Sequence, residues 1–128
     1  MLADTITDTH FAKRDRLSRL LVFMARILND GCASQIRAIG VDENTALLLE
    51  SDGTSRVVGE GAVYFLTARQ PPQNCAYRAP LTFNAVVVQR AQPGKTFDLK
   101  KWSGETETYN RSVEEGIIRA SGSPHGIY

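Results

Sequence analysis

The most regular pattern in the chain is a set of apolar residues at helical spacing. These residues are Leu17, Leu20, Leu21, Met24, Ile27 and Leu28. Positions three and four apart share one face of an α-helix, so the pattern predicts a helix with one buried stripe. Gly31 follows and suits the left-handed conformation that ends many helices. Val22 and Phe23 lie off the stripe, which predicts a helix packed against both a sheet and a neighbouring element.

Short apolar runs separated by turn residues predict strands along the rest of the chain. The runs cover residues 5–7, 36–41, 46–49, 56–58, 62–66 and 81–88. Asp52-Gly53 stands between two of them and is a strong signal for a β-hairpin. The last run contains Ala85-Val86-Val87-Val88, which alternates little and predicts a strand buried on both faces.

The remaining segments have weaker patterns. Residues 42–44 are polar and predict a corner or bulge between two strands. Residues 70–80 contain Pro71, Pro72 and Pro80 and predict a loop. Residues 98–102 predict a single helical turn, and residues 103–128 show little periodicity.

Composition and charge narrow the class of protein. The chain has 128 residues, of which 42% are apolar and 23% charged, which is typical of one globular domain. A net charge of +1 removes the bulk electrostatic argument for nucleic acid or an anionic membrane as the main partner. No apolar run approaches the roughly 18 residues of a membrane span. The first residues do not resemble a secretory leader, so the expected compartment is the cytoplasm.

Cysteine and histidine are too few for a metal cluster. Cys32 and Cys75 are isolated, and His10 and His125 are the only histidines. We therefore expect free thiols, and neither a metal ion nor another cofactor.

Basic residues concentrate after His10, at the expected junction between a strand and the helix. The stretch from His10 to Arg37 holds six basic residues, Lys13, Arg14, Arg16, Arg19, Arg26 and Arg37, and two acidic ones, Asp15 and Asp30. A histidine at the carboxyl edge of a sheet can transfer protons near neutral pH, and arginines bind carboxylates through paired N–H donors. A second interpretation stays open: a solvated helix start whose arginines pair with Asp4, Asp8 and Asp15.

Other polar residues near this stretch have less specific patterns. Asp42 and Glu43 could supply carboxylate chemistry, but at a strand corner we expect them to hold the backbone turn and to pair with an arginine. Ser18 and Ser34 lie nearest the basic stretch. Neither stands in a Gly-x-Ser-x-Gly turn, so neither is assigned as a nucleophile.

Several separated motifs follow one another in a recognisable order. The first consists of Asp8, His10, Phe11, Arg14, Arg16, Arg19 and Leu20, and the second of Gly40, Asp42, Glu43, Thr45 and Ala46. Residues 59–63 and the closing Gly126-Ile127-Tyr128 add to the series. Together they resemble cyanophycinases and the cyanophycinase-like serine peptidases, relatives of aspartyl dipeptidase, from about Ile6 to the last residue.

The resemblance implies an α/β fold, namely the C-terminal half of a class I glutamine amidotransferase-like (flavodoxin-like) three-layer fold with a β-hairpin-rich C-terminal portion. Residues 1–128 would form a single partial domain, with a parallel sheet between helices. In this family a serine on a strand-turn-helix elbow attacks the peptide carbonyl, a histidine moves the proton, and an acidic residue orients the imidazole. His10 matches the histidine.

The resemblance also implies what this chain does not carry. The serine elbow and the acidic residue are expected before the histidine, and no Gly-x-Ser-x-Gly occurs in the sequence. We therefore expect a serine-bearing N-terminal half as a partner, and no activity from this chain alone. A homodimer is compatible with this arrangement, whereas nucleic acid and membranes are not expected partners.

A substrate site is implied as well. It would consist of Asp8, Arg14, Arg16 and Arg19, with Arg37 as a less direct match. Cyanophycin is a polyaspartate whose side-chain carboxyls carry arginine, and the family releases β-aspartyl-arginine dipeptides from it. Thr9 departs from the glutamine expected in cyanophycinases, which leaves a broader β-aspartyl peptidase open. The alternative function is a non-catalytic module that binds acidic peptides or a partner subunit.

Overall fold

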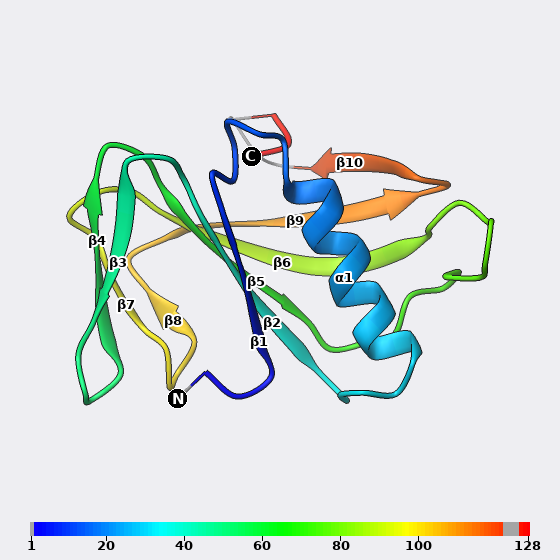
Figure 1. The fold of residues 1–128 in the computed structure, drawn as a ribbon, viewed down its shortest axis with the longest axis horizontal. Coiled ribbons are helices and arrows are strands. Elements are labelled where there is room, and N and C mark those ends of the chain that lie inside the picture. Colours follow the sequence, from blue (N-terminus) through cyan, green and yellow to red (C-terminus); the bar gives the residue numbers. More distant parts are fainter. Residues whose placement is uncertain (1, 122–125) are drawn as a thin grey trace.

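Two β-sheets and one α-helix make up residues 2–121 and 126–128, the parts of the chain that this computed structural model describes (Figure 1). The helix, α1, spans Leu17–Asn29. The strands are β1 (Thr5–Thr9), β2 (Ile36–Val41), β3 (Thr45–Leu49), β4 (Thr54–Gly59), β5 (Val63–Ala68), β6 (Phe83–Ala91), β7 (Thr96–Asp98), β8 (Ser103–Gly104), β9 (Glu107–Glu114) and β10 (Ile117–Ser121). Each strand predicted from an apolar run is present.

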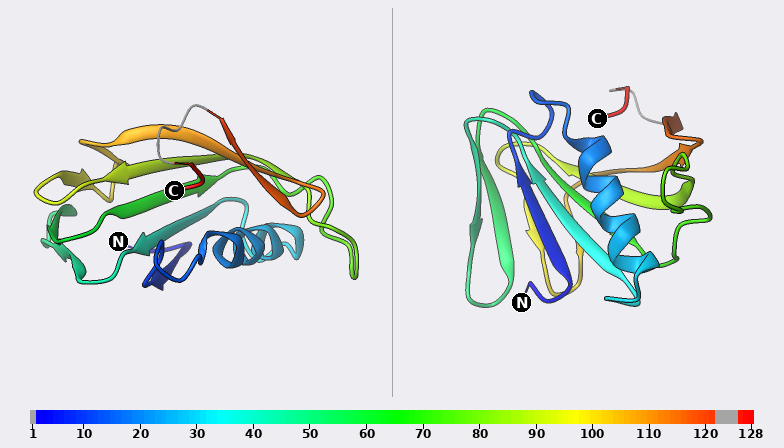
Figure 2. Two further views of the ribbon diagram at one scale, coloured as in Figure 1. Left: turned by 90° about the horizontal axis from the view of Figure 1, so that it is seen from above. Right: turned by 45° about the vertical axis from the view of Figure 1, so that its right-hand side comes forward.

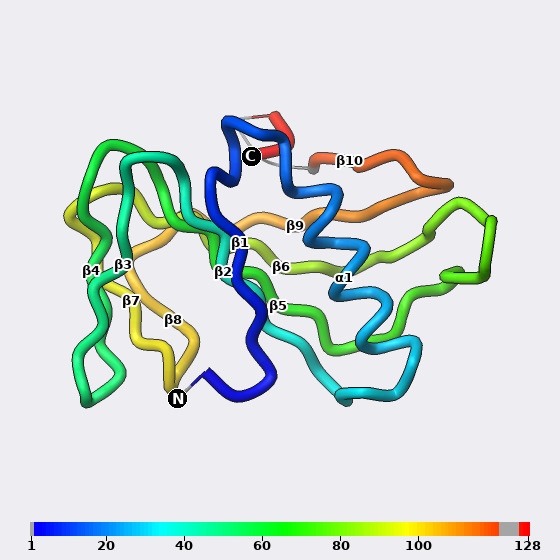
Figure 3. The backbone as a smooth tube through the Cα atoms, viewed as in Figure 1, coloured from blue at the N-terminus to red at the C-terminus, as the bar shows by residue number. Residues whose placement is uncertain are grey.

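Antiparallel hairpins dominate both sheets. The larger sheet has the strand order β1-β2-β5-β6-β9-β10, and the smaller one the order β3-β4-β7-β8. Among the described strands only β1 and β2 run parallel, as the chain trace in Figure 3 shows. The α/β class and the hairpin-rich C-terminal portion are confirmed. The parallel sheet is limited, in these residues, to a single pair of strands.

Helix α1 begins and ends as predicted, but it packs on one side only. Its buried residues are Leu17, Leu20, Leu21, Met24, Ala25 and Leu28, and they pack with side chains of the larger sheet. Figure 2 shows the helix lying along one face of this sheet. Gly31 follows the helix with a φ of +71°. Val22 and Phe23 remain 44% and 52% exposed, so the predicted second contact is wrong within the described residues. With 13 residues α1 cannot span a membrane, and the described ranges hold no other helix.

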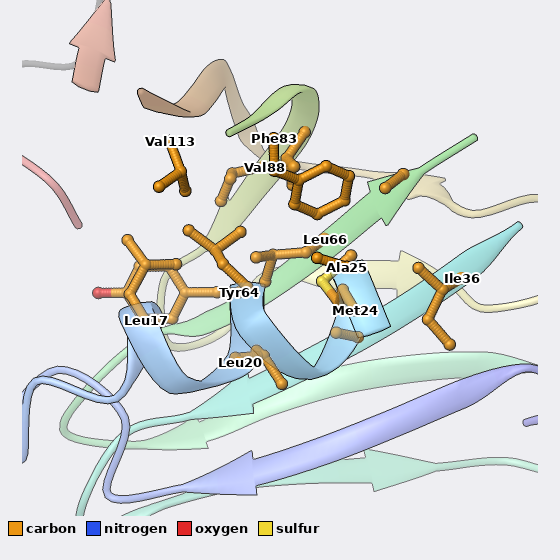
Figure 4. Close-up of a cluster of buried hydrophobic side chains, with 14 of the residues drawn as sticks. Leu17, Leu20, Met24, Ala25, Ile36, Tyr64, Leu66, Phe83, Val88 and Val113 are labelled. Carbon is orange, nitrogen blue, oxygen red and sulfur yellow. The ribbon is translucent and has the colours of Figure 1, made fainter. Parts of the chain in front are cut away.

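Strand β5 separates two hydrophobic cores. Tyr64 and Leu66 pack with side chains of α1 in the first core (Figure 4). On the other face of the strand, Phe65 stacks on Phe97 of the smaller sheet with ring centroids 3.7 Å apart. The strand buried on both faces is therefore β5 and not the predicted run at 81–88. In β6 Val87 stays partly exposed, because it lines an open pocket instead of a core.

Residues 99–102 form a turn between β7 and β8, not the helical turn predicted for 98–102. The Asp98 carboxylate accepts hydrogen bonds from the backbone N–H groups of Lys100 and Lys101, at 2.9 and 3.0 Å. An aspartate that bonds its own backbone in this way closes a tight turn, so local polar chemistry replaces helical hydrogen bonding here.

The predicted corner at residues 42–44 carries the chain from the larger sheet to the smaller one. Just before it, Gly40 in β2 lies against the fully buried ring of Phe11. A Cβ atom at position 40 would stand 2.6 Å from Cγ of Phe11, closer than packed atoms allow. Glycine at this position thus lets the segment after His10 fold back onto β2.

Replacing Gly40 by alanine is expected to lower the free energy of unfolding by about 1–3 kcal/mol, because the buried Phe11 ring has to move. Urea unfolding measures the loss as a lower midpoint at constant slope. In the Phe11→Leu background the same replacement should cost less, since a smaller side chain relieves the contact. An unchanged midpoint for Gly40→Ala would contradict this packing.

Candidate functional site

His10 lies where β1 ends and the chain turns toward α1. Its backbone has a φ of +53°, in the left-handed region that residues other than glycine seldom occupy. The next residue, Phe11, donates its backbone N–H to the carbonyl of Val41, so the turn stays attached to the end of β2. Strained backbone of this kind is concentrated at functional sites, and here it fixes where the imidazole points.

The carboxylate of Glu43 stands beside the His10 imidazole. Oε1 of Glu43 lies 3.4 Å from Nδ1 of His10, slightly longer than a formed hydrogen bond. Nδ1 is buried although the side chain as a whole is 40% exposed, so the exposed surface belongs to the remainder of the ring. The ring thus has one nitrogen at a carboxylate and leaves Nε2 for another proton partner.

Lys13 completes this group. Its ammonium pairs with Oε2 of Glu43. The hydrogen bond from Lys13 is the largest cause that holds the pKa of the Glu43 carboxyl below its usual range, and the charges of Lys13 and His10 act in the same direction. Glu43 is consequently ionised near neutral pH and can stabilise positive charge on the imidazole.

The strand corner presents Glu43 to the histidine. Asp42 points inward, where its two oxygens accept the backbone N–H groups of Ala12 and Ala62 at 2.9 and 3.0 Å. Thr45 Oγ1 donates to the Glu43 carbonyl and accepts the N–H of Gly61. Glu43 follows Asp42 in the turn and pairs with His10 and Lys13, so the corner binds its own backbone with one carboxylate and presents the next one to the histidine.

The structure corrects one expectation about acidic residues. Asp42 holds the turn as predicted, but within the described ranges Glu43 pairs with His10 and Lys13 and with no arginine. The acidic residue that the resemblance places before the histidine would lie outside this sequence and stays a prediction. Here the carboxylate beside the imidazole comes from Glu43, which follows it. The sequence feature that could have identified Glu43 is its place beside Asp42 at a strand corner, where one carboxylate binds the backbone and the other is free to meet the histidine.

Asp8 is the anchor of the arginines at the start of α1. Its side chain is 5% exposed and accepts hydrogen bonds from Nη1 of Arg16 and Nε of Arg19, both at 3.1 Å. Arg19 adds a second bond through Nη2. Burial by itself raises the pKa of the Asp8 carboxyl, but the bonds from Arg19 and Arg16 outweigh it and leave that pKa lowered.

These contacts divide the predicted substrate residues into three kinds. Asp8 and Arg19 are engaged with each other through paired bonds, so they position their neighbours. Arg16 donates to Asp8 only through Nη1, so its other N–H groups can bind a ligand. Arg14 is exposed and makes no side-chain hydrogen bond or ion pair with any described residue. Of the second interpretation, the pairing of arginines with Asp8 is present, but Asp8 is buried rather than solvated. Neither Asp4 nor Asp15 pairs with an arginine in the described part of the chain; Asp15 accepts a hydrogen bond from Tyr128.

Arg37 lies apart from this group. It pairs with Thr5 in the β1–β2 register, at the end of the two strands away from His10. Its guanidinium lies over the ring of Trp102, 4.7 Å from the centroid. The prediction that groups Arg37 with Arg14, Arg16 and Arg19 is thus wrong in position, because residues at opposite ends of a strand cannot meet at one site.

The C-terminal residues contact the start of α1, next to the site. The Tyr128 hydroxyl donates to Asp15 at 2.8 Å and accepts the backbone N–H of Leu17 at 3.2 Å, which supplies the cap that no side chain at Arg16 provides. Burial is the largest cause that raises the pKa of Tyr128. Arg111, 1% exposed, donates to the carbonyls of Gly126 and Ile127 and holds this end in place.

The described residues include no group of three or more histidine, cysteine and acidic side chains that could hold a metal ion. Cys32 and Cys75 are free thiols. His125 lies outside the described residues. Ser18 is in the first turn of α1 and Ser34 precedes β2, and in the described structure neither hydroxyl forms a hydrogen bond with His10.

Comparison with known proteins adds to this geometry. A cyanophycinase from Synechococcus elongatus is 35% identical over 69 residues, which are 54% of this chain and 20% of that protein. Cyanophycinases from Trichormus variabilis and a Nostoc species are each 29% identical over 126 residues, which are 94% of this chain and 37% of theirs. No family model matches the chain.

The chain spans between a fifth and about two fifths of the length of these curated relatives. The longer alignments include the His10 turn, the strand corner with Glu43 and most of the strands that follow, since they extend over nearly all of the chain. The resemblance found in the motifs is therefore confirmed: this chain is similar to cyanophycinases over most of its length.

Proposed function

We propose that this chain carries the general base and part of the substrate site of a serine-type peptidase that acts on cyanophycin or related β-aspartyl peptides, in the cytoplasm. The products would be β-aspartyl-arginine dipeptides. The observation that carries the proposal is the Glu43 carboxylate at Nδ1 of a partly exposed His10. Similarity to proteins named cyanophycinase supports the same assignment.

Each member of this pair has a defined role. Nε2 of His10 accepts the proton of a serine hydroxyl as that oxygen attacks the peptide carbonyl, and later returns it to the leaving amine. Glu43 fixes the orientation of the ring and stabilises the imidazolium that forms. The 3.4 Å separation is compatible with this role, because such contacts often tighten only when substrate is bound.

The nucleophile is proposed to come from residues outside this sequence. The sequence has no Gly-x-Ser-x-Gly elbow, and Ser18 in α1 lacks the sharp strand-to-helix turn that exposes a nucleophilic hydroxyl. A serine-bearing segment would have to bring its hydroxyl to the exposed side of His10.

Arg14 and the unoccupied donors of Arg16 are proposed to bind substrate carboxylates. Guanidinium groups bind carboxylates through two parallel N–H donors, which suits a substrate that carries arginine α-carboxylates along its length. Asp8 and Arg19 act on the substrate only through Arg16, which they hold in place. Thr9, next to His10, is the position at which a broader choice of β-aspartyl peptide would arise.

A non-catalytic module that binds acidic peptides remains the alternative, favoured by the exposed Arg14 and the missing elbow. The two functions differ in what they require of the His10–Glu43 pair: the peptidase needs it, and a binding module does not. The test below therefore separates them.

The experiment measures β-aspartyl-arginine released from cyanophycin by the purified chain, by the serine-bearing N-terminal part of a cyanophycinase, and by the two together. We expect release only from the mixture, and none when the elbow serine is replaced by alanine. Release by the chain alone would disprove an external nucleophile. A mixture that forms a complex and binds cyanophycin without cleaving it would favour the binding module.

A further inference from the structure

Apart from the site around His10, a polar pocket lies on the face of the larger sheet that points away from α1. On β5 and β6, Leu66 and Val88 belong to the core under the helix, so the adjacent Thr67 and Val87 face the opposite side. There they line a pocket of about 380 Å³, together with residues of β2 and of the turn before β8. This pocket is remote from His10, which follows the other end of β1.

The charged side chains that line the pocket are all basic. They are Arg37, Arg69 and Lys101. Lys101 reaches Asp98 at 3.4 Å, whereas neither arginine has a carboxylate partner among residues 2–121 and 126–128. Two unneutralised guanidinium groups in one concave site create a local positive potential in a chain whose net charge is only +1.

Trp102 holds one of these guanidinium groups in place. The ring of Trp102 is 8% exposed, and its backbone carbonyl accepts a hydrogen bond from Nε2 of Gln89 in β6 at 3.2 Å. Arg37 lies over this ring, 4.7 Å from its centroid. Cation–π attraction at this distance holds the guanidinium at the pocket, so Arg37 loses less side-chain freedom when a ligand binds.

We propose that this pocket binds the side-chain carboxylates of an acidic peptide. Arg37 and Arg69 supply planar donor pairs that match carboxylates. Ala85 and Val87 form an apolar floor that can cover the methylene groups of aspartate or glutamate. Such a floor favours a carboxylate on an aliphatic stem over a free inorganic anion. The proposal does not depend on catalysis at His10.

The chain provides its own reporter for the test, since Trp102 is its only tryptophan. The probe is tetra-aspartate with acetylated and amidated ends, and tetra-asparagine with the same ends is the uncharged control. At constant ionic strength we expect a saturable change in Trp102 fluorescence with tetra-aspartate and none with tetra-asparagine. Inorganic phosphate that binds as tightly as tetra-aspartate would overturn the peptide assignment.

Variants locate the binding. Arg69→Gln, at an exposed residue, should weaken tetra-aspartate binding about tenfold, because one charge-assisted hydrogen-bonding partner is lost. Arg37→Gln should weaken tetra-aspartate binding by at least as much. Binding to this variant is measured by calorimetry, because the substitution alters the surroundings of Trp102. The matched control is Arg119→Gln, an exposed arginine paired with Glu114 on the neighbouring strand, which should bind as the unmodified chain does. Equal affinity in all three variants, or no saturable binding at all, would overturn the proposal.

Discussion

His10→Ala is expected to reduce dipeptide release by the serine-complemented protein by about 10²–10⁴-fold, because the imidazole that takes the hydroxyl proton is lost. Folding should persist, since the side chain is 40% exposed and makes no hydrogen bond through Nδ1. His10→Asn is a companion variant, because asparagine tolerates the left-handed backbone at this position. Turnover is measured for each variant, and urea unfolding checks that the variant is folded. Near-normal turnover in a folded variant would disprove the assignment of His10.

Glu43→Gln separates an orienting role from a purely structural one. The amide keeps the size of the side chain but no longer stabilises the imidazolium, so we expect lower turnover and an acid limb of the pH–rate profile displaced to lower pH. Glu105→Gln is the matched control: Glu105 also pairs with a lysine, Lys95, but lies just after β8 of the smaller sheet. A pH profile identical to that of the unmodified protein would show that Glu43 does not act on the His10 imidazole and only pairs with Lys13.

Asp8→Asn is expected to lower the free energy of unfolding by about 2–3 kcal/mol near pH 6, since it removes a buried carboxylate and leaves two guanidinium groups without it. The side chain is 5% exposed, so water cannot fully replace the lost bonds. Urea unfolding at fixed ionic strength measures the effect. Asp30→Asn is the control, because Asp30 pairs with Arg26 at the surface of the same helix, where ion pairs contribute about 0–1 kcal/mol.

The effect of Asp8→Asn should also depend on pH. Because the folded state lowers the pKa of the Asp8 carboxyl, its ionised form contributes stability in full above the pKa of the unfolded state, about 4. This contribution is lost as the pH falls further, through the lowered pKa. The difference between the two proteins should therefore be largest near neutrality and shrink in acid. A difference that is constant down to acid pH would show that the Asp8 charge contributes nothing.

Local pattern was enough to predict the elements that build the site. The period of apolar residues gave α1, Gly31 marked its end, and Asp52-Gly53 marked the β3–β4 hairpin. These features depend on residues a few positions apart, so the local amino-acid sequence is enough to predict them. Strand β9 was missed because its alternation of exposed and buried positions is carried by polar as well as apolar residues, including the buried Arg111. Strand β10 was missed because residues 117–120 include no buried position, so no alternating pattern marks it.

By itself the sequence determined which residues are available for chemistry: a histidine at a strand end, a run of arginines after it, and a carboxylate pair at a strand corner. Only the tertiary structure decided how they combine. It brought Glu43 to His10, turned Asp8 into the anchor of Arg16 and Arg19, and placed Arg37 in a separate pocket. The physical reason is that these contacts depend on the register of β1 and β2 and on which way the corner at Asp42 turns, both of which are set by packing between distant segments.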